Sequence, residues 1–267
     1  MVFSLTAQNR VYQPTNFGQL ISTGSVTAKA LNGRQIGVPQ PQLGCLSVAP
    51  LAASTTNLAN AVTATTGAAY ITLTAGTGVT AVAGIYNSYT NTTDTVYYFD
   101  VPRAVIITEA AGGAAVTYTV WGFDEDDVFM TEQIAVAGGV GATTGTGKKA
   151  FAGVTRVYAS AASTAAISVG TTDIIGLPYV MYNANSVLAG NFGTAATIVP
   201  VATYVQASVA TATATTGDIR GTALLPAASD GTKRLFVTWV IAATTAEVNA
   251  QTYATVYGVP QYAAPYN

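Results

Sequence analysis

Short runs of Val, Ile, Thr and Tyr, each ended by Gly, Asn, Asp or Pro, recur along the chain from residue 69 onward. Such residues favour extended backbone, and turn residues roughly every 8 to 12 positions are typical of β-sandwiches and jelly rolls. No run of ten or more residues has strong helical spacing. We therefore expect an all-β protein with one or more β-sandwich or jelly-roll-like domains. Strands are predicted at residues 69–74, 79–86, 95–100, 103–109, 115–123, 128–136, 151–159, 165–170, 177–182, 197–209, 219–225, 234–242 and 252–258.

Side-chain alternation is clearest in two of these strands. In the strand at 115–123, Val116, Tyr118 and Val120 form one face and Thr and Trp side chains form the other. The strand at 234–242 is apolar on both faces, which favours a central position in a sandwich.

The chain divides into three parts by composition. Residues 1–50 are rich in Gly and Pro and lack periodicity, so we expect an extended N-terminal arm. A β-sandwich domain is predicted over residues 51–190, beginning with one short helix over 51–62. After a linker near residues 189–193, a second β-rich segment over 191–267 either completes the same sandwich or forms a smaller domain. It ends in a Tyr- and Pro-rich tail.

Charged residues make up only 8% of the chain, against about 25% in ordinary soluble domains. Depletion of charge is typical of the core of a protein interface, so we expect neighbouring subunits to cover much of the surface. A neutral surface rich in Thr, Ser, Asn and Gln is the simpler alternative. With a net charge of −2, no basic cluster and no apolar run long enough to span a bilayer, we expect neither nucleic acid nor membrane as a partner.

The residue inventory excludes several kinds of chemistry. Histidine is absent and Cys45 is the single cysteine, which excludes Ser-His-Asp and Cys-His nucleophiles, zinc sites built on His or thiolates, and an intrachain disulfide. Two-carboxylate hydrolysis remains open, with Glu109 and Glu132 as candidates, but solvent-facing strand residues are the simpler interpretation. Residues 138–149 depart from the phosphate-binding loop pattern at Ala142 and Lys149, and we interpret them as a flexible hairpin loop. We predict no catalytic residue, no cofactor and no enzymatic activity.

An acidic cluster over residues 124–127 separates two predicted strands. Hard cations such as Ca²⁺ prefer several carboxylate oxygens, which makes Asp124, Asp126 and Asp127 weak candidates for a metal site. The cluster lacks the spacing and glycine of an EF-hand loop. We therefore favour a solvated hairpin tip and predict no metal.

Fifteen tyrosines stand beside eight Phe and two Trp. Tyrosine is favoured at interfaces because it buries a ring and keeps a polar tip. Tyr253, Tyr257, Tyr262 and Tyr266, in the C-terminal tail, are our interface candidates. Ordinary cross-strand packing and an aromatic carbohydrate-binding platform are the alternative interpretations of the tyrosines.

From about Val101 to Gly258 the chain resembles tailed-bacteriophage capsid decoration, or cement, proteins in the sequence pattern of its strands and turns. The resemblance implies a small β-sandwich, often trimeric, that clamps major capsid subunits. The acidic turn at 124–127 departs from the neutral Gly/Asn turn of many such proteins. The resemblance rests on Val116–Gly122 with Met130–Ile134, Gly147–Thr155, Ser168–Pro178, and Thr216–Gly221 with Ser229–Arg234.

These observations lead to an expected function. We expect a virion structural protein, a capsid decoration or cement protein assembled in the host cytoplasm. Its partners would be the major capsid protein and copies of itself, as a homo-trimer or higher oligomer. The alternatives are the major capsid protein itself, or a carbohydrate-binding or adhesin-type β-module on a fibre or cell surface.

Overall fold

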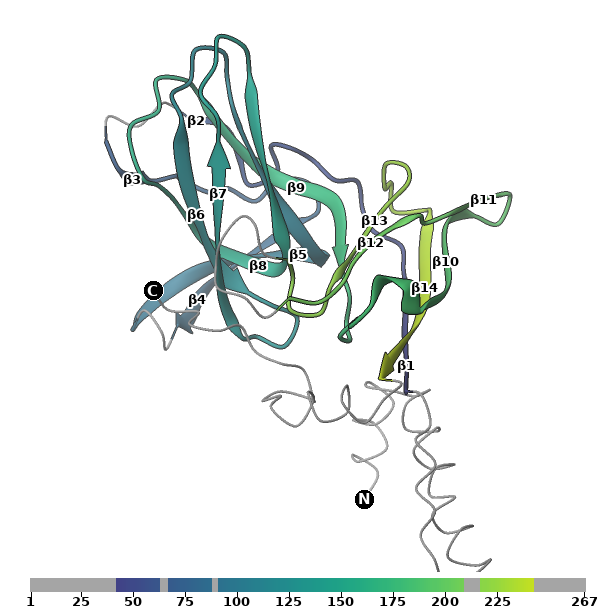
Figure 1. Ribbon diagram of the computed structural model, residues 1–267. Helices are drawn as coiled ribbons and strands as arrows, with labels where there is room; N and C mark the ends of the chain where they lie inside the picture. Colours follow the sequence, from purple (N-terminus) through teal and green to yellow (C-terminus); the bar gives the residue numbers. More distant parts are fainter. Residues whose placement is uncertain (1–41, 63–66, 88–90, 209–216, 243–267) are drawn as a thin grey trace, which may run out of the picture.

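A computed structural model describes residues 42–62, 67–87, 91–208 and 217–242 (Figure 1). The prediction of an all-β protein is confirmed, because these residues form two antiparallel sheets arranged as a sandwich-like unit, with one short 3₁₀ turn. The elements are β1 (Gln42–Val48), β2 (Ala59–Val62), β3 (Ala69–Tyr70), β4 (Val79–Asn87), β5 (Thr92–Glu109), β6 (Val116–Phe123), β7 (Phe129–Val136), β8 (Thr143–Ala159), β9 (Ile167–Gly176), η1 (Ala184–Ser186), β10 (Val187–Thr194), β11 (Thr197–Pro200), β12 (Thr203–Val205), β13 (Thr222–Leu224) and β14 (Arg234–Ala242).

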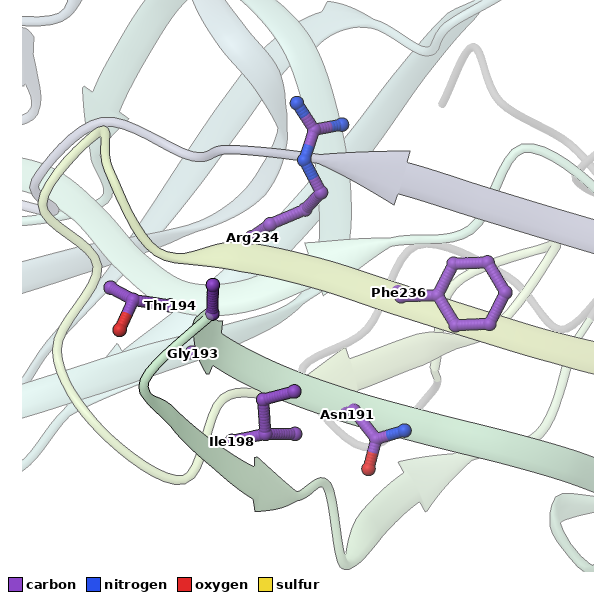
Figure 2. Close-up of a pocket in the computed structure, with 7 residues that line it drawn as sticks. Asn191, Gly193, Thr194, Ile198, Arg234 and Phe236 are labelled. Atoms are coloured by element: carbon purple, nitrogen blue, oxygen red, sulfur yellow. The ribbon is translucent and has the colours of Figure 1, made fainter.

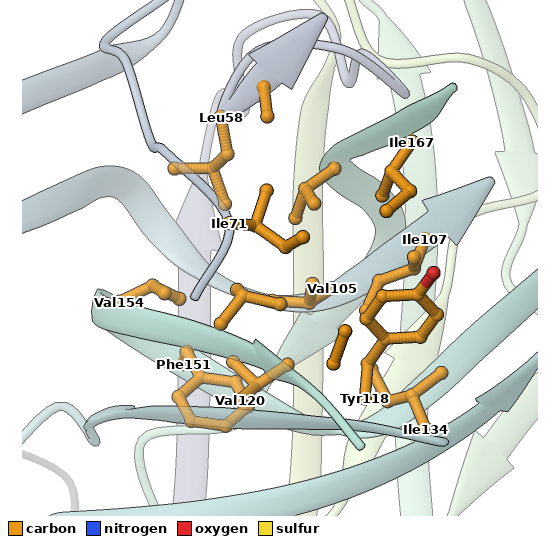
Figure 3. Close-up of a cluster of buried hydrophobic side chains, with 14 of the residues drawn as sticks. Leu58, Ile71, Val105, Ile107, Tyr118, Val120, Ile134, Phe151, Val154 and Ile167 are labelled. Carbon is orange, nitrogen blue, oxygen red and sulfur yellow. The ribbon is translucent and has the colours of Figure 1, made fainter. Parts of the chain in front are cut away.

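The larger sheet has the order β12-β13-β9-β5-β8-β6-β7, and β2, β3 and β4 pair with β9, β8 and β5. Its inner faces enclose the main core, part of which is drawn in Figure 3. Along β6, Val116, Tyr118 and Val120 are buried while the intervening residues are half-buried, as the alternation predicts. Each fully buried side chain of this size contributes about 1.5–3 kcal/mol to folding.

The smaller sheet has the order β1-β14-β10-β11, with β14 near its centre as predicted. Leu235, Val237 and Trp239 of β14 point inward and form a second core with residues of β9 and β13, which belong to the larger sheet. The Trp239 indole N–H donates to the Val180 carbonyl at 3.2 Å. The two sheets share this core, and residues 191–242 contribute strands to both of them.

A buried arginine ties connecting segments to β5. Arg103 donates to both Asp100 carboxylate oxygens at 2.9 Å and to the Leu51 carbonyl at 2.6 Å. It also lies 3.7 Å from the Asp173 carboxylate and is almost fully enclosed. A guanidinium has enough donors to serve several acceptors at once, so one side chain fixes segments that come from distant parts of the sequence.

Two local predictions are wrong. Residues 51–62 contain no helix: the Leu58 N–H donates to the Val169 carbonyl at 3.0 Å, and β2 follows directly. The stretch at 138–149 is not wholly a hairpin loop, because β8 already begins at Thr143. A Cβ on Gly145 would lie 2.6 Å from the Ala135 carbonyl oxygen, so glycine here permits close strand packing.

Several segment boundaries also differ from expectation. The end of the stretch predicted as an arm, Gln42–Val48, is strand β1, and residues 1–41 lie outside the described residues. The predicted linker near 189–193 is part of β10, whereas the strand predicted at 177–182 is irregular backbone. The strand predicted at 252–258 lies outside the described residues.

Candidate assembly surface

The few charged side chains are largely used inside the molecule. Burial of a charge is costly unless the charge is paired or hydrogen-bonded, so buried ions normally have a specific role. Their burial leaves the surface even poorer in charge than the composition implies. Among the residues that the structure describes, eight charged ones are buried: Asp94, Arg103, Glu109, Asp124, Glu132, Lys149, Asp218 and Arg220.

Arg220, one of these buried charged residues, pairs with the acidic turn between β6 and β7. Both terminal guanidinium nitrogens of Arg220 lie 3.1 Å from Asp124 Oδ2, and Arg220 also pairs with Asp126. Asp124 Oδ1 accepts the N–H groups of Asp126 and Val128, each at 2.9 Å. Burial raises the pKa of Asp124, and the charge of Arg220 opposes that shift. Asp124 is fully buried, so the prediction of a solvated hairpin tip is wrong for this residue.

The structure gives the three weak metal candidates separate roles. Asp124 and Asp126 bind Arg220, while Asp127 has a φ of 60° at the turn. Within the described ranges, no group of three or more His, Cys, Asp or Glu side chains could hold a metal ion. The turn thus binds the side chain of Arg220, which lies far away in sequence.

Glu109 and Glu132 are fully buried, so the expectation that they face solvent is wrong. Glu109 accepts the Tyr118 hydroxyl at 2.5 Å. Glu132 accepts the backbone N–H groups of Lys148 at 2.6 Å and Lys149 at 3.3 Å, where β8 shifts register against β5. Burial raises the pKa of Glu132 to about 8, against the opposing effect of these hydrogen bonds. Glu132 therefore accepts backbone donors at the irregularity of β8.

A long uncharged stretch contains one edge strand of each sheet. No Asp, Glu, Lys or Arg stands between Asp173 and Asp218. Within this stretch, β11 is one edge of the smaller sheet and is exposed at every residue, and β12 is one edge of the larger sheet. Natural proteins usually guard exposed edges with charged side chains, which this stretch lacks.

Several exposed apolar side chains lie on these two strands or on β10, β13 and β14 of the same two sheets. Ile198 and Leu188 are each 62% exposed. Most large hydrophobic side chains of a monomer are covered, and contiguous apolar patches usually mark interaction sites. We call the two strands together with these side chains the edge surface. It consists of β11, β12, Leu188, Ile198, Val199, Val205, Leu224 and Phe236.

A hollow of about 300 Å³ opens on the outer face of the smaller sheet, within the edge surface (Figure 2). Strand register places its lining on one face, since Asn191 lies opposite Phe236, and Gly193 lies between Ile198 and Arg234. Arg234 donates to the Ser47 hydroxyl at 3.1 Å. The hollow thus combines exposed apolar side chains with one cation at its rim.

The tyrosines predicted as interface residues, Tyr253, Tyr257, Tyr262 and Tyr266, lie outside the described residues. The segment that carries them follows Ala242 at the end of β14, and Ala242 pairs with Gln42 at the start of β1. Our sequence reasoning did not single out the edge surface. The uncharged stretch after Asp173 is the signal that could have identified it.

Comparison of the chain with models of known protein families, with curated proteins and with solved structures finds no match. Among the helices that the structure describes, none is long and apolar enough to cross a membrane.

Proposed function

We propose that the protein is a virion structural component, a capsid decoration or cement protein that attaches to a shell of major capsid subunits through the edge surface. The observation that carries the proposal is the exposed, uncharged edge formed by β11 and β12. Unpaired N–H and C=O groups on an exposed edge provide a template for pairing with a strand of another chain.

The energetics favour association with neighbouring subunits. Burial of apolar area contributes roughly 25 cal/mol per Å², and a shell repeats each such contact many times. With eight charged side chains buried, the described part of the chain has few charged groups left on its surface to oppose contact between subunits. The expected partners are the major capsid protein and copies of this chain, in a homo-trimer or higher oligomer within the virion.

The experiment introduces a charge into the edge surface. Ile198→Lys should weaken self-association and binding to empty shells by at least about tenfold, because lysine blocks an apolar edge. Val140→Lys is the matched control, since Val140 is fully exposed on the β7–β8 connection, outside the edge surface. Light scattering after size exclusion gives the oligomeric state, and co-sedimentation measures shell binding.

Two results would count against the proposal. One is a wild-type protein that stays monomeric at high concentration and does not sediment with shells. The other is an Ile198→Lys variant that associates as well as the Val140→Lys variant. Closed shells assembled by the chain alone and seen by electron microscopy would instead indicate a major capsid protein.

A further inference from the structure

Three aromatic side chains form a cluster on the outer face of the larger sheet. Ring centroids of Tyr70, on β3, lie 5.8 Å from Trp121, on β6, and 5.2 Å from Tyr158, on β8. Trp121 and Tyr158 are 6.1 Å apart. Tyr70 is 56% exposed, so the cluster has a face open to solvent.

Strand register explains why these rings face outward together. Tyr70 lies opposite Tyr158, and Trp121 lies opposite Arg156. Their neighbours along the strands, such as Val120 and Val157, are fully buried in the core. Because side chains alternate along a strand, the aromatic residues are directed away from the core.

A hollow of about 260 Å³ lies beside the cluster, where β8 changes partner. β5 pairs with β8 as far as Val154, and β3 pairs with it from Tyr158 onward. Tyr70, Thr95 and Arg156 are among the side chains that line the hollow. The hollow lies where β8 changes its strand partner, next to the exposed rings.

The polar groups at this site are fixed and electrically balanced. Arg156 donates to Asp94 at 2.5 Å and to the Thr92 hydroxyl at 2.9 Å. The Arg156 guanidinium also lies over the Tyr70 ring, 5.7 Å from its centroid. The ion pair raises the pKa of Arg156, so the site holds one cation and one anion together.

We propose that this aromatic platform, made of Tyr70, Trp121, Tyr158, Arg156 and Asp94, binds a neutral saccharide. A sugar ring presents an apolar C–H face, which packs on aromatic rings, and hydroxyl groups, which bond to fixed donors and acceptors. The paired charges disfavour ligands that carry a net charge. Nucleic acid would need a basic surface, and among the described residues that form the site Arg156 is the one cation.

The proposal goes beyond attachment to a shell and does not depend on it. β3 and β11 lie on opposite sides of the molecule in Figure 1, so the platform is far from the edge surface. A protein attached through the edge surface would leave the platform free to contact a saccharide.

Tryptophan fluorescence provides a direct test on the full chain. Trp121 and Trp239 are the two tryptophans, and Trp239 is fully buried, so a change on adding sugar reports on Trp121. The probes are maltohexaose, cellohexaose and N-acetylchitohexaose, followed by an array of neutral glycans. Saturation-transfer NMR on the wild-type protein gives a second readout that requires no variant.

We expect at least one neutral saccharide to bind, and Tyr70→Ala and Arg156→Gln to weaken it by about tenfold or more. Tyr86→Ala is the matched control, because Tyr86 is 63% exposed on β4, outside the platform. Ile198→Lys should retain saccharide binding, which separates this test from that of the shell proposal.

The proposal is overturned if no neutral glycan on the array binds, or if binding is the same in Tyr70→Ala and Tyr86→Ala. It is also overturned if Tyr70→Ala disrupts association with a protein partner while the wild-type protein gives no saturation transfer to any sugar. In that case the platform is a protein contact.

Discussion

Replacement of Arg220 by Met should remove a large part of the stability of the fold. Arg220 is 3% exposed, and its guanidinium balances the fully buried Asp124 and the partly buried Asp126. Methionine keeps an unbranched apolar side chain like the arginine stem but lacks the guanidinium, which leaves two carboxylates without their cation. Removal of one partner of a buried ion pair typically costs about 3–5 kcal/mol. We expect a loss of that size in the free energy of unfolding at neutral pH.

A second variant tests whether the uncompensated charge causes the loss. Asp124→Asn keeps the Oδ1 acceptor for the N–H groups of Asp126 and Val128 and removes the negative charge. The double variant Arg220→Met, Asp124→Asn should therefore recover about 1–3 kcal/mol relative to Arg220→Met alone. Removal of Arg220 also raises the pKa of Asp124 further, so the cost of Arg220→Met should shrink at acidic pH, where Asp124 is protonated.

The assay is urea unfolding followed by far-UV circular dichroism and tryptophan fluorescence, with the slope of the transition checked in each variant. The reasoning is refuted if Arg220→Met loses less than about 1 kcal/mol. It is equally refuted if the double variant is no more stable than Arg220→Met, since the buried charge would then not be the cause.

Two further predictions concern the buried carboxylate and the smaller sheet. The Glu132 pKa is raised from 4.5 to about 8 in the folded state, so its stabilising contribution is present below pH 4.5 and is lost as pH rises through 8. Relative to Glu132→Gln, the wild type should lose up to about 5 kcal/mol of unfolding free energy over that interval, measured by urea titrations at several pH values; a constant difference would contradict the argument. A Cβ on Gly44 would lie 2.4 Å from the Trp239 ring, so Gly44→Ala should cost about 1–3 kcal/mol in thermal unfolding. Gly67→Ala is its control, because among the described residues no atom beyond its chain neighbours lies within 4 Å of the added Cβ, and equal melting temperatures for the two variants would count against the packing.

The strands with regular alternation were predictable from sequence because one buried face imposes a period of two. β6 follows this rule directly, whereas β14 is apolar on both faces in sequence but buries only the face of Leu235, Val237 and Trp239, and Phe236 is exposed. β8 extends through residues 143–149 because Gly145 and Gly147 allow β7 and β5 to approach closely, and that contact is not visible in a glycine-rich sequence. The sequence around Leu58 suggested a helix, but its backbone bonds to β9, which lies far along the chain.

The candidate site was harder to predict because its partners are distant in sequence. The sequence around the acidic turn does not indicate that Arg220 neutralises Asp124. The aromatic platform joins Tyr70, Trp121 and Tyr158 from three separate strands, and only sheet register brings them together. By contrast, the uncharged stretch between Asp173 and Asp218 can be seen in the sequence, and it indicates edge strands without charged side chains.

The pairing of Gln42 with Ala242 determines how the fold would respond to mechanical force. The segments before β1 and after β14 join the sheet at the same end of one antiparallel pair. Tension applied between these segments would open the pair one hydrogen-bonded step at a time, since the strands would peel apart instead of sliding. A load applied between either segment and the edge surface would act across several strands together. The fold would therefore resist a pulling force better when the load acts between one flank and the edge surface than when it acts between both flanks.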